Sequence, residues 1–215
     1  MISVKKVKTI NSIGIDFDNT IVCYDDVFCN LAFNKGWVNK NSGLSKNKVR
    51  DLIHKSNNGI EKWKELQSMV YSDLISIAPP MSDVFKFIKS CNYHNISICI
   101  VSHKTEYAEI DTNGGNLREK ALDWIHAHKV KYGVHLPADN IYFTDTREEK
   151  IKLIKKLKFD YFIDDLEGVL CHRIFPRDVR RILISRSKKR VYSNCSLTRK
   201  KNWSEIRDYV LGKEK

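Results

Sequence analysis

The chain has 215 residues, of which 42% are hydrophobic and 30% charged, and these proportions are ordinary for a soluble globular protein. Its formal net charge is +12, which leaves nucleic acid, a small phosphorylated substrate or a solvated lysine-rich surface as alternatives. No apolar run approaches the ~18 residues of a membrane span, and no signal-like apolar block follows the first lysines, so we expect a cytoplasmic protein without a membrane partner.

A short apolar strand leads into the run Asp16-Phe17-Asp18-Asn19-Thr20. Its two carboxylates lie two residues apart, where a parallel strand delivers its side chains to the carboxyl edge of a sheet. Carboxylates this close repel each other, and burying both is costly unless a cation or a proton compensates. The run therefore indicates a divalent metal and an anionic substrate, and its alternative is an ordinary Asp-rich turn after a strand.

The stretch from residue 25 to residue 78 is predicted to be helical and contains no strand. Apolar side chains recur there at helical spacing, Ser45 is a plausible N-cap, and Pro79-Pro80 ends the stretch. The expected helices span residues 26–33, 46–55 and 60–77.

Strands and helices alternate in the rest of the chain. Ser82 is the expected N-cap of a helix over 83–93, and a strand over 96–101 ends on Ser102. The later elements are a helix over 116–131, a strand over 141–143, a helix from Lys150 to Leu157, strands over 161–163 and 181–185, and a helix over 203–211. This alternation predicts an α/β fold with a parallel sheet and right-handed crossovers.

Polar side chains suited to a metal and phosphate site follow three of the expected strands, and a lysine precedes the last of them. These residues are, in chain order, Asp16, Asp18, Ser102, Lys150, Asp164 and Asp165. The ordered set resembles the haloacid dehalogenase (HAD) superfamily, whose motifs are DxDx[TV], a Ser or Thr after the second strand, a Lys, and a paired acid. The resemblance spans roughly residues 10–185.

The resemblance implies a three-layer, Rossmann-like core with a parallel sheet in the order 5-4-1-2-3, which puts the first motif strand in the centre. It also implies a small, all-helical cap of the C1 type, inserted after the first motif. On this basis the core comprises residues 1–24 and 79–215, and the cap comprises residues 25–78.

The resemblance also assigns roles to the acids, in the phosphatase branch of the superfamily. Asp16 would attack phosphorus and form an aspartyl-phosphate, and Asp18 would be the general acid and base. An acid at the position of Asp18 argues against a dehalogenase, because a halide leaving group needs no proton. Mg²⁺ would be bound by Asp16, the backbone carbonyl of Asp18, and Asp164, with Asp165 either a ligand through water or an anchor for Lys150.

The remaining motif residues would contact the phosphoryl group or the rest of the substrate. Ser102 would donate to a phosphoryl oxygen, and Lys150 would offset charge on the phosphoryl group and the nucleophile. Thr20 would fix the turn and contact the phosphate region, and His103 and Lys104 would bind substrate. Further candidates for contacts with the leaving group are Tyr24, Asp25, Trp37, His54 and Lys55.

The function that follows is a Mg²⁺-dependent phosphomonoester hydrolase acting on a small phosphorylated metabolite, with a sugar phosphate favoured. A 5′-nucleotidase, a polynucleotide-end phosphatase and a phosphomutase remain alternatives within the superfamily. A different class of protein would be a non-catalytic module that binds nucleic acid or protein. Nucleic acid is not favoured, because the basic stretch over 177–201 has few aromatic side chains to stack on bases. The sequence leaves the oligomeric state open.

The six cysteines form no CxxC pair. Free thiols in a reducing compartment therefore fit them better than a framework of disulfides, and structural zinc is not expected.

Overall fold

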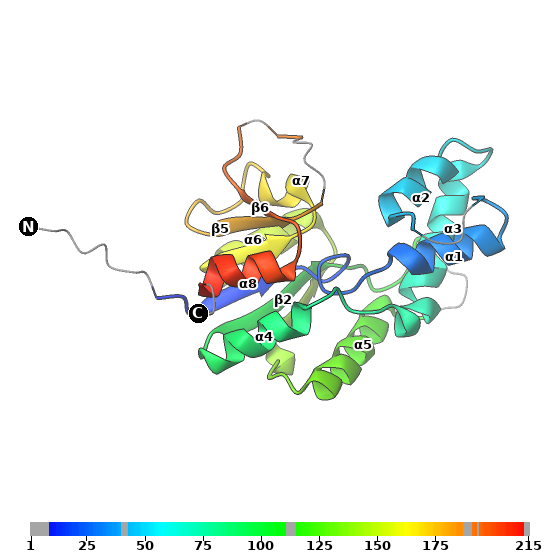
Figure 1. Ribbon diagram of the computed structural model, residues 1–215. Helices are drawn as coiled ribbons and strands as arrows, with labels where there is room; N and C mark the ends of the chain where they lie inside the picture. The colour runs from blue at the N-terminus through cyan, green and yellow to red at the C-terminus, as the bar shows by residue number, and fades with distance from the viewer. Residues whose placement is uncertain (1–8, 40–42, 111–114, 187–190, 193, 213–215) are drawn as a thin grey trace, which may run out of the picture.

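The computed structural model describes residues 9–39, 43–110, 115–186, 191–192 and 194–212. Its centre is a six-stranded parallel sheet in the order β3-β2-β1-β4-β5-β6 (Figure 1). The strands are β1 (Ser12–Ile15), β2 (Ser97–His103), β3 (Ile141–Thr144), β4 (Tyr161–Asp164), β5 (Arg180–Ile184) and β6 (Thr198–Lys200). The predicted order of five strands is confirmed, with β1 in the centre, and β6 extends the sheet by an edge strand that the sequence did not predict.

Helices cover both faces of the sheet and make it the middle of three layers (Figure 1). Along β2, Ile98 and Ile100 belong to one apolar cluster, while Cys99 and Val101 belong to the other, as the alternation of side chains along a strand requires. The first cluster includes side chains of α4 (Val84–Tyr93), α5 (Leu117–Tyr132) and α8 (Trp203–Leu211), and the second those of α6 (Arg147–Leu157) and α7 (Glu167–Leu170).

The central strand is packed so closely that one of its positions admits no side chain. A Cβ at Gly14 would lie 2.6 Å from side-chain atoms of both Phe159 and Phe162. These rings belong to the cluster beneath α6 and α7, so the glycine lets that layer approach the backbone of β1.

Residues 25–78, which we call the helical segment, form a separate block beside the sheet (Figure 1). Its elements are α1 (Asp25–Asn34), α2 (Lys46–Ile53), α3 (Gly59–Tyr71) and the 3₁₀ helix η1 (Asp73–Ile77). The Phe28 ring stacks on Trp63 and meets Tyr71 edge-on, at centroid distances of 4.9 and 5.7 Å, which gives the block its own aromatic contacts. None of the helices in the described ranges could span a membrane. The division of the chain into core and cap stays a prediction.

The predicted single helix over 60–77 is wrong, because the helix ends at Tyr71. Ser72 leaves the helical dihedrals, with φ of −94° and ψ of −87°. Its hydroxyl donates to the carbonyl of Ser68 at 2.7 Å, a side-chain bond that bends or ends helices. The chain continues as the 3₁₀ helix η1. By contrast, the predicted N-cap Ser45 is confirmed, since its hydroxyl accepts from the Lys48 amide.

The predicted N-cap Ser82 is wrong by one residue. Asp83 is the N-cap of α4, with a left-handed φ of 65°, and the helix itself begins at Val84. The carboxylate of Asp83 pairs with Lys86 at 2.8 Å instead of capping the backbone.

The prediction that Lys150 begins its helix is wrong. A capping box starts α6 at Arg147: the Thr146 hydroxyl accepts from the Glu149 amide, and the Glu149 carboxylate accepts from the Thr146 amide. Lys150 therefore lies one turn inside α6, where the helix backbone fixes its position.

The expectation of free thiols is wrong for two cysteines. Cys171, just after α7, forms a disulfide with Cys195, just before β6, across a Cα–Cα distance of 5.5 Å. The pairing follows from the path of the chain, since β5 and β6 return Cys195 to the end of α7, and no local spacing reveals it. Among the described residues, the other cysteines, Cys23, Cys29, Cys91 and Cys99, form no disulfide.

Candidate active site

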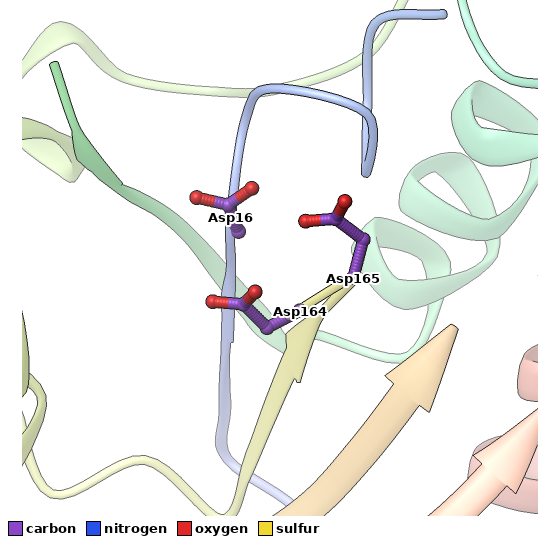
Figure 2. A group of neighbouring side chains, drawn as sticks. All are labelled: Asp16, Asp164 and Asp165. Atoms are coloured by element: carbon purple, nitrogen blue, oxygen red, sulfur yellow. The ribbon is translucent and has the colours of Figure 1, made fainter. Parts of the chain in front are cut away.

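Three carboxylates meet at the carboxyl edge of the sheet, where β1 and β4 lie side by side (Figure 2). The Asp16 amide donates to the Ile163 carbonyl at 2.9 Å, so the pairing of the two strands continues one residue past β1. Oxygens of Asp16, Asp164 and Asp165 all lie within 4.8 Å of one another. Asp16 and Asp164 are buried and Asp165 is half-buried, so this group of negative charges requires cations nearby.

Lys150 supplies one of these cations. Its Nζ donates to Asp16 Oδ1 at 2.6 Å and to Asp164 Oδ2 at 2.7 Å. Burial alone would lower the pKa of Lys150, but the two carboxylates outweigh burial and raise it, so the side chain stays charged. Lys150 is therefore anchored by Asp164, and not by Asp165 as one of the two predicted roles of Asp165 would require.

One ammonium group cannot neutralise three carboxylates. Asp165 has no hydrogen bond or ion pair with any other residue that the structure describes, and burial, followed by the charges of Asp164 and Asp16, raises its pKa well above the usual range. Burial also raises the pKa of Asp16 to about 7, although Lys150 opposes it. The surplus negative charge and the all-oxygen donor set fit a hard divalent cation such as Mg²⁺.

Asp18 lies outside this cluster and has its own partners. The Tyr24 hydroxyl donates to Asp18 Oδ1 at 2.8 Å, and Lys104 Nζ pairs with Asp18 Oδ2 at 3.1 Å. The Asp18 side chain is 20% exposed, whereas that of Lys104 is only 2% exposed. The two acids of the first motif are therefore held by two different buried lysines. The predicted contact between a metal and the Asp18 carbonyl stays a prediction.

The turn after Asp16 explains the motif's last two residues. Asn19 has a left-handed φ of 58°, which an asparagine tolerates better than most side chains. Thr20 is fully buried and its hydroxyl donates to Asp16 Oδ2 at 3.1 Å. Thr20 therefore orients the Asp16 carboxylate, but Thr20 itself does not line the cavity that Asp16 lines.

Ser102 presents a hydroxyl group without a partner. It lies in β2, which runs beside β1, and the residue is 1% exposed. Its Oγ has no hydrogen-bond partner among the described residues, yet the residue lines the same cavity as Asp16 and Lys150. A buried donor without an acceptor is costly, so the hydroxyl is suited to an oxyanion that enters the cavity.

A cavity of about 570 Å³ lies between this sheet edge and the helical segment. On the sheet side its wall includes Asp16, Asp18, Ser102, Lys150 and Asp165. On the other side the wall is formed by residues of α2 and α3, which are Lys46, Asn47, Arg50, Trp63, Lys64, Gln67, Ser68 and Tyr71.

The residues predicted to contact substrate divide into two groups. His103 and Lys104 line the cavity, with His103 exposed and its Nε2 2.9 Å from the Asp145 carbonyl oxygen. Lys104 is buried against Asp18, so it supports an acid of the site as well as lining the wall. The other candidates do not line the cavity: Tyr24, Asp25, Trp37, His54 and Lys55.

Several wall residues were missed at the sequence level. Trp63, Gln67 and Tyr71 share one face of α3 at a spacing of four residues, a periodicity that the sequence shows but that does not tell which way the face points. Lys46 and Arg147 stand at the first positions of α2 and α6, and nothing in the sequence distinguishes them from surface cations.

No family model and no curated protein matches the chain. Solved structures do match. A HAD-superfamily hydrolase from Ehrlichia chaffeensis gives a TM-score of 0.54 at 15% identity, covering 95% of this chain and 97% of that chain. The HAD hydrolase YfnB from Bacillus subtilis, bound to magnesium, gives 0.55 at 12% identity, covering 96% and 100%. A mutant of CbbY from Rhodobacter sphaeroides, in complex with xylulose-1,5-bisphosphate, gives 0.53 at 10% identity, covering 92% and 96%.

These likenesses extend over nearly the whole of both chains, so they concern the helical segment as well as the sheet. Identities this low show the fold alone. The chain therefore has the α/β fold of the HAD hydrolases, with its carboxylate cluster at the carboxyl edge of the central strands.

Proposed function

We propose that the protein is a Mg²⁺-dependent phosphomonoester hydrolase that works through an aspartyl-phosphate on Asp16. The observation that carries this proposal is the setting of the Asp16 carboxylate. Lys150 and Thr20 fix its two oxygens, and the unpartnered Ser102 hydroxyl lines the cavity with it. The magnesium in YfnB and the sugar bisphosphate in CbbY support the same reading.

In the first step an oxygen of Asp16 attacks the phosphorus of the ester. The bond from phosphorus to the alcohol oxygen breaks, and that oxygen takes a proton from Asp18 and leaves as the alcohol. Lys150 holds the nucleophile and offsets its charge, and the Ser102 hydroxyl donates to a phosphoryl oxygen. Asp18 must exchange its present donors for the leaving group, and its partial exposure makes this exchange feasible.

In the second step water attacks the phosphorus of the aspartyl-phosphate. The bond from phosphorus to Asp16 breaks, inorganic phosphate leaves, and Asp18 takes up the proton of the water, which restores both acids. The separation of the two acids, one held by Lys150 and the other by Lys104, suits these different tasks.

Asp16, Asp164 and Asp165 would hold the Mg²⁺ ion. When bound, the ion would offset the negative charges of the carboxylate and of the phosphoryl group, which otherwise repel each other. Asp165, which forms no hydrogen bond or ion pair with another described residue, gains most from the ion.

We also propose that the helical segment is a cap over the site and that the substrate is a small phosphorylated metabolite, with a sugar phosphate favoured. The cavity between the segment and the sheet edge measures about 570 Å³. Cavities of roughly 300–1,000 Å³ are typical for small molecules.

The test is hydrolysis of 4-nitrophenyl phosphate with and without Mg²⁺. We expect turnover that requires the ion and that falls by at least about 10³-fold in Asp16→Asn, because the amide is not a nucleophile. The matched control is Asp123→Asn, a change of the same type at an exposed position of α5. Acid quenching followed by peptide mass analysis should find phosphate on the peptide that contains Asp16. Turnover that survives in Asp16→Asn would contradict the nucleophilic role, and a wild type that binds nucleic acid but hydrolyses no ester would favour the binding module.

A further inference from the structure

The cavity wall contains more positive charge than the proposed chemistry uses. Its cationic side chains are Lys46, Arg50, Lys64, Lys104, Arg147 and Lys150. Four of them are committed to acids: Lys150 to Asp16 and Asp164, Lys104 to Asp18, Lys64 to Glu109, and Arg50 to Asp51. Lys46 and Arg147 have no ion pair with any residue in the described ranges.

Lys46 is held at the start of α2. Its backbone amide donates to Asp25 Oδ1 at 2.8 Å, and its half-buried ammonium lies 5.3 Å from the ring centre of Tyr71 and 5.6 Å from that of Phe28. Burial alone would lower the pKa of Lys46, but Tyr71 and then the charge of Asp18 raise it. Asp165 raises it as well, but Lys46 forms no ion pair with Asp18 or Asp165, so the helical segment presents to the cavity a positive charge that is not committed to one carboxylate.

Arg147 presents the second unmatched charge from the sheet side. It is the first residue of α6 and precedes Lys150 by three positions, so the two side chains lie on neighbouring parts of one helix face. Lys150 reaches inward to Asp16, whereas Arg147 is exposed at the wall of the same cavity. The two unmatched cations therefore come from the two sides between which the cavity lies.

We infer that the substrate is a small phosphomonoester whose leaving group carries a second anionic group, a phosphate or a carboxylate, bound by Lys46 and Arg147. The inference rests on the proposed function and names its substrate class. The reacting phosphoryl group is matched by Lys150, Ser102 and the metal site, which leaves these two cations for another anion. Charge-assisted hydrogen bonds at a half-buried position are among the stronger polar contacts, so the second anion adds substantial affinity.

Two alternatives to this inference predict different experimental results. Lys46 could serve only to stack on Tyr71 and Phe28, which would make it a structural residue. A phosphorylated oligonucleotide also offers a second anion, in its neighbouring phosphodiester. The enclosure of Lys46 by two rings and the volume of the cavity, about 570 Å³, favour a small molecule.

The experiment compares fructose 1,6-bisphosphate with fructose 1-phosphate in the wild type, Lys46→Gln and Arg147→Gln. We expect each variant to lose about 10- to 100-fold in kcat/KM for the bisphosphate, mainly through KM, as is typical when a charged contact is removed. The loss for the monophosphate should be smaller by about tenfold or more. Lys46→Arg should recover most of the loss. Lys48→Gln and Lys152→Gln are matched controls at exposed positions of the same helices, outside the cavity wall.

Binding is also measured without turnover, so that this inference and the proposed function fail separately. Calorimetry with Asp16→Asn should show tighter binding of the bisphosphate than of the monophosphate, and the added change Lys46→Gln should abolish the difference. Equal losses for both sugars, accompanied by a lower melting temperature, would show that Lys46 is only a structural residue. Turnover of a 5′-phosphorylated dinucleotide that exceeds turnover of the bisphosphate and depends on Lys46 would overturn the small-molecule assignment.

Discussion

Two buried lysines, each 2% exposed, pair with the two aspartates of the first motif, and their surroundings differ. Lys150 belongs to α6 and contacts Asp16 and Asp164, which end adjacent strands of the sheet. Lys104 follows β2 and contacts Asp18, and its ammonium lies 4.7 Å from the ring centre of Tyr71 in the helical segment. The first arrangement is built from the sheet and the helix α6 that packs on it, and the second joins the sheet to the helical segment.

This difference matches what each acid must do during the proposed reaction. Asp16 has to point at phosphorus throughout, and its partners come from elements that pack in one core. Asp18 has to release one partner and accept another, and its partners come from both sides of the boundary. Tyr24, which precedes α1, also donates to Asp18, and its ring packs edge-on against Tyr71 of the helical segment. A shift of the helical segment would therefore change the hydrogen bonding of Asp18. The movable acid thus lies at the boundary that closure of a cap would alter.

Removal of Lys150 should give the largest effect. In Lys150→Met two buried carboxylates, Asp16 and Asp164, lose their shared cation, and breaking a buried ion pair from one side typically costs about 3–5 kcal/mol. We expect the free energy of unfolding, measured in urea without metal, to fall by this amount. Lys152→Met on the same helix should change it by less than about 0.5 kcal/mol, because that side chain is exposed. A loss as small as that of the control would mean that the carboxylates are neutral when Lys150 is absent.

The next largest effect concerns pH and metal. Burial raises the pKa of Asp16 from 3.8 to about 7 in the folded protein. A folded-state pKa above the unfolded value means that the associated stability is complete below about pH 4 and is lost as pH rises through about 7. We expect metal-free protein to lose about 2–4 kcal/mol more than Asp16→Asn between those values, since one pH unit corresponds to about 1.4 kcal/mol.

Mg²⁺ should cancel this loss, because the ion binds the ionised carboxylates. Thermal unfolding at about pH 5 and about pH 8, with and without the ion, measures the effect. The ion should raise the melting temperature clearly at the higher pH and little at the lower one. Parallel pH curves for wild type and Asp16→Asn would show that Asp16 ionises normally and needs no cation.

The residues at the sheet edge of this site can be predicted from the sequence, because each is marked by a pattern of neighbouring residues in the chain. Asp16, Ser102 and Asp164 each lie at the end of an apolar strand. Parallel strands deliver such residues to one edge of the sheet, so the sequence alone predicts that these three side chains lie close together. The sequence also contains the capping box that fixes Lys150, in Thr146 followed three residues later by Glu149. This signal predicts that the helix begins at Arg147 and not at Lys150.

The contacts between the sheet edge and the helical segment could not be predicted in this way. The pairing of Lys104 with Asp18 and the position of Lys46 depend on how the helical segment packs against the sheet edge, and helical periodicity gives the apolar face of a helix but not its neighbour. The disulfide between Cys171 and Cys195 was missed for the same reason, since it depends on the return of β6. Contacts between elements that are far apart along the chain are the features that local sequence patterns specify least.

The smallest effect is a coupling between Lys104 and the helical segment. Lys104→Met should cost about 1–3 kcal/mol, less than Lys150→Met, because Asp18 keeps the Tyr24 hydroxyl and is partly exposed to water. Combined with Tyr71→Leu, it should show an interaction energy of about 0.5–2 kcal/mol, since the ammonium lies over that ring.

The control is a second double-mutant cycle, which combines Tyr71→Leu with Lys150→Met. Here we expect additivity within about 0.5 kcal/mol, because Lys150 contacts Asp16 and Asp164 and shares no partner with Tyr71. Urea unfolding of the single and double variants gives both interaction energies. Equal coupling of both lysines to Tyr71 would mean that the sheet edge and the helical segment respond as one unit, and Asp18 would then be held as rigidly as Asp16.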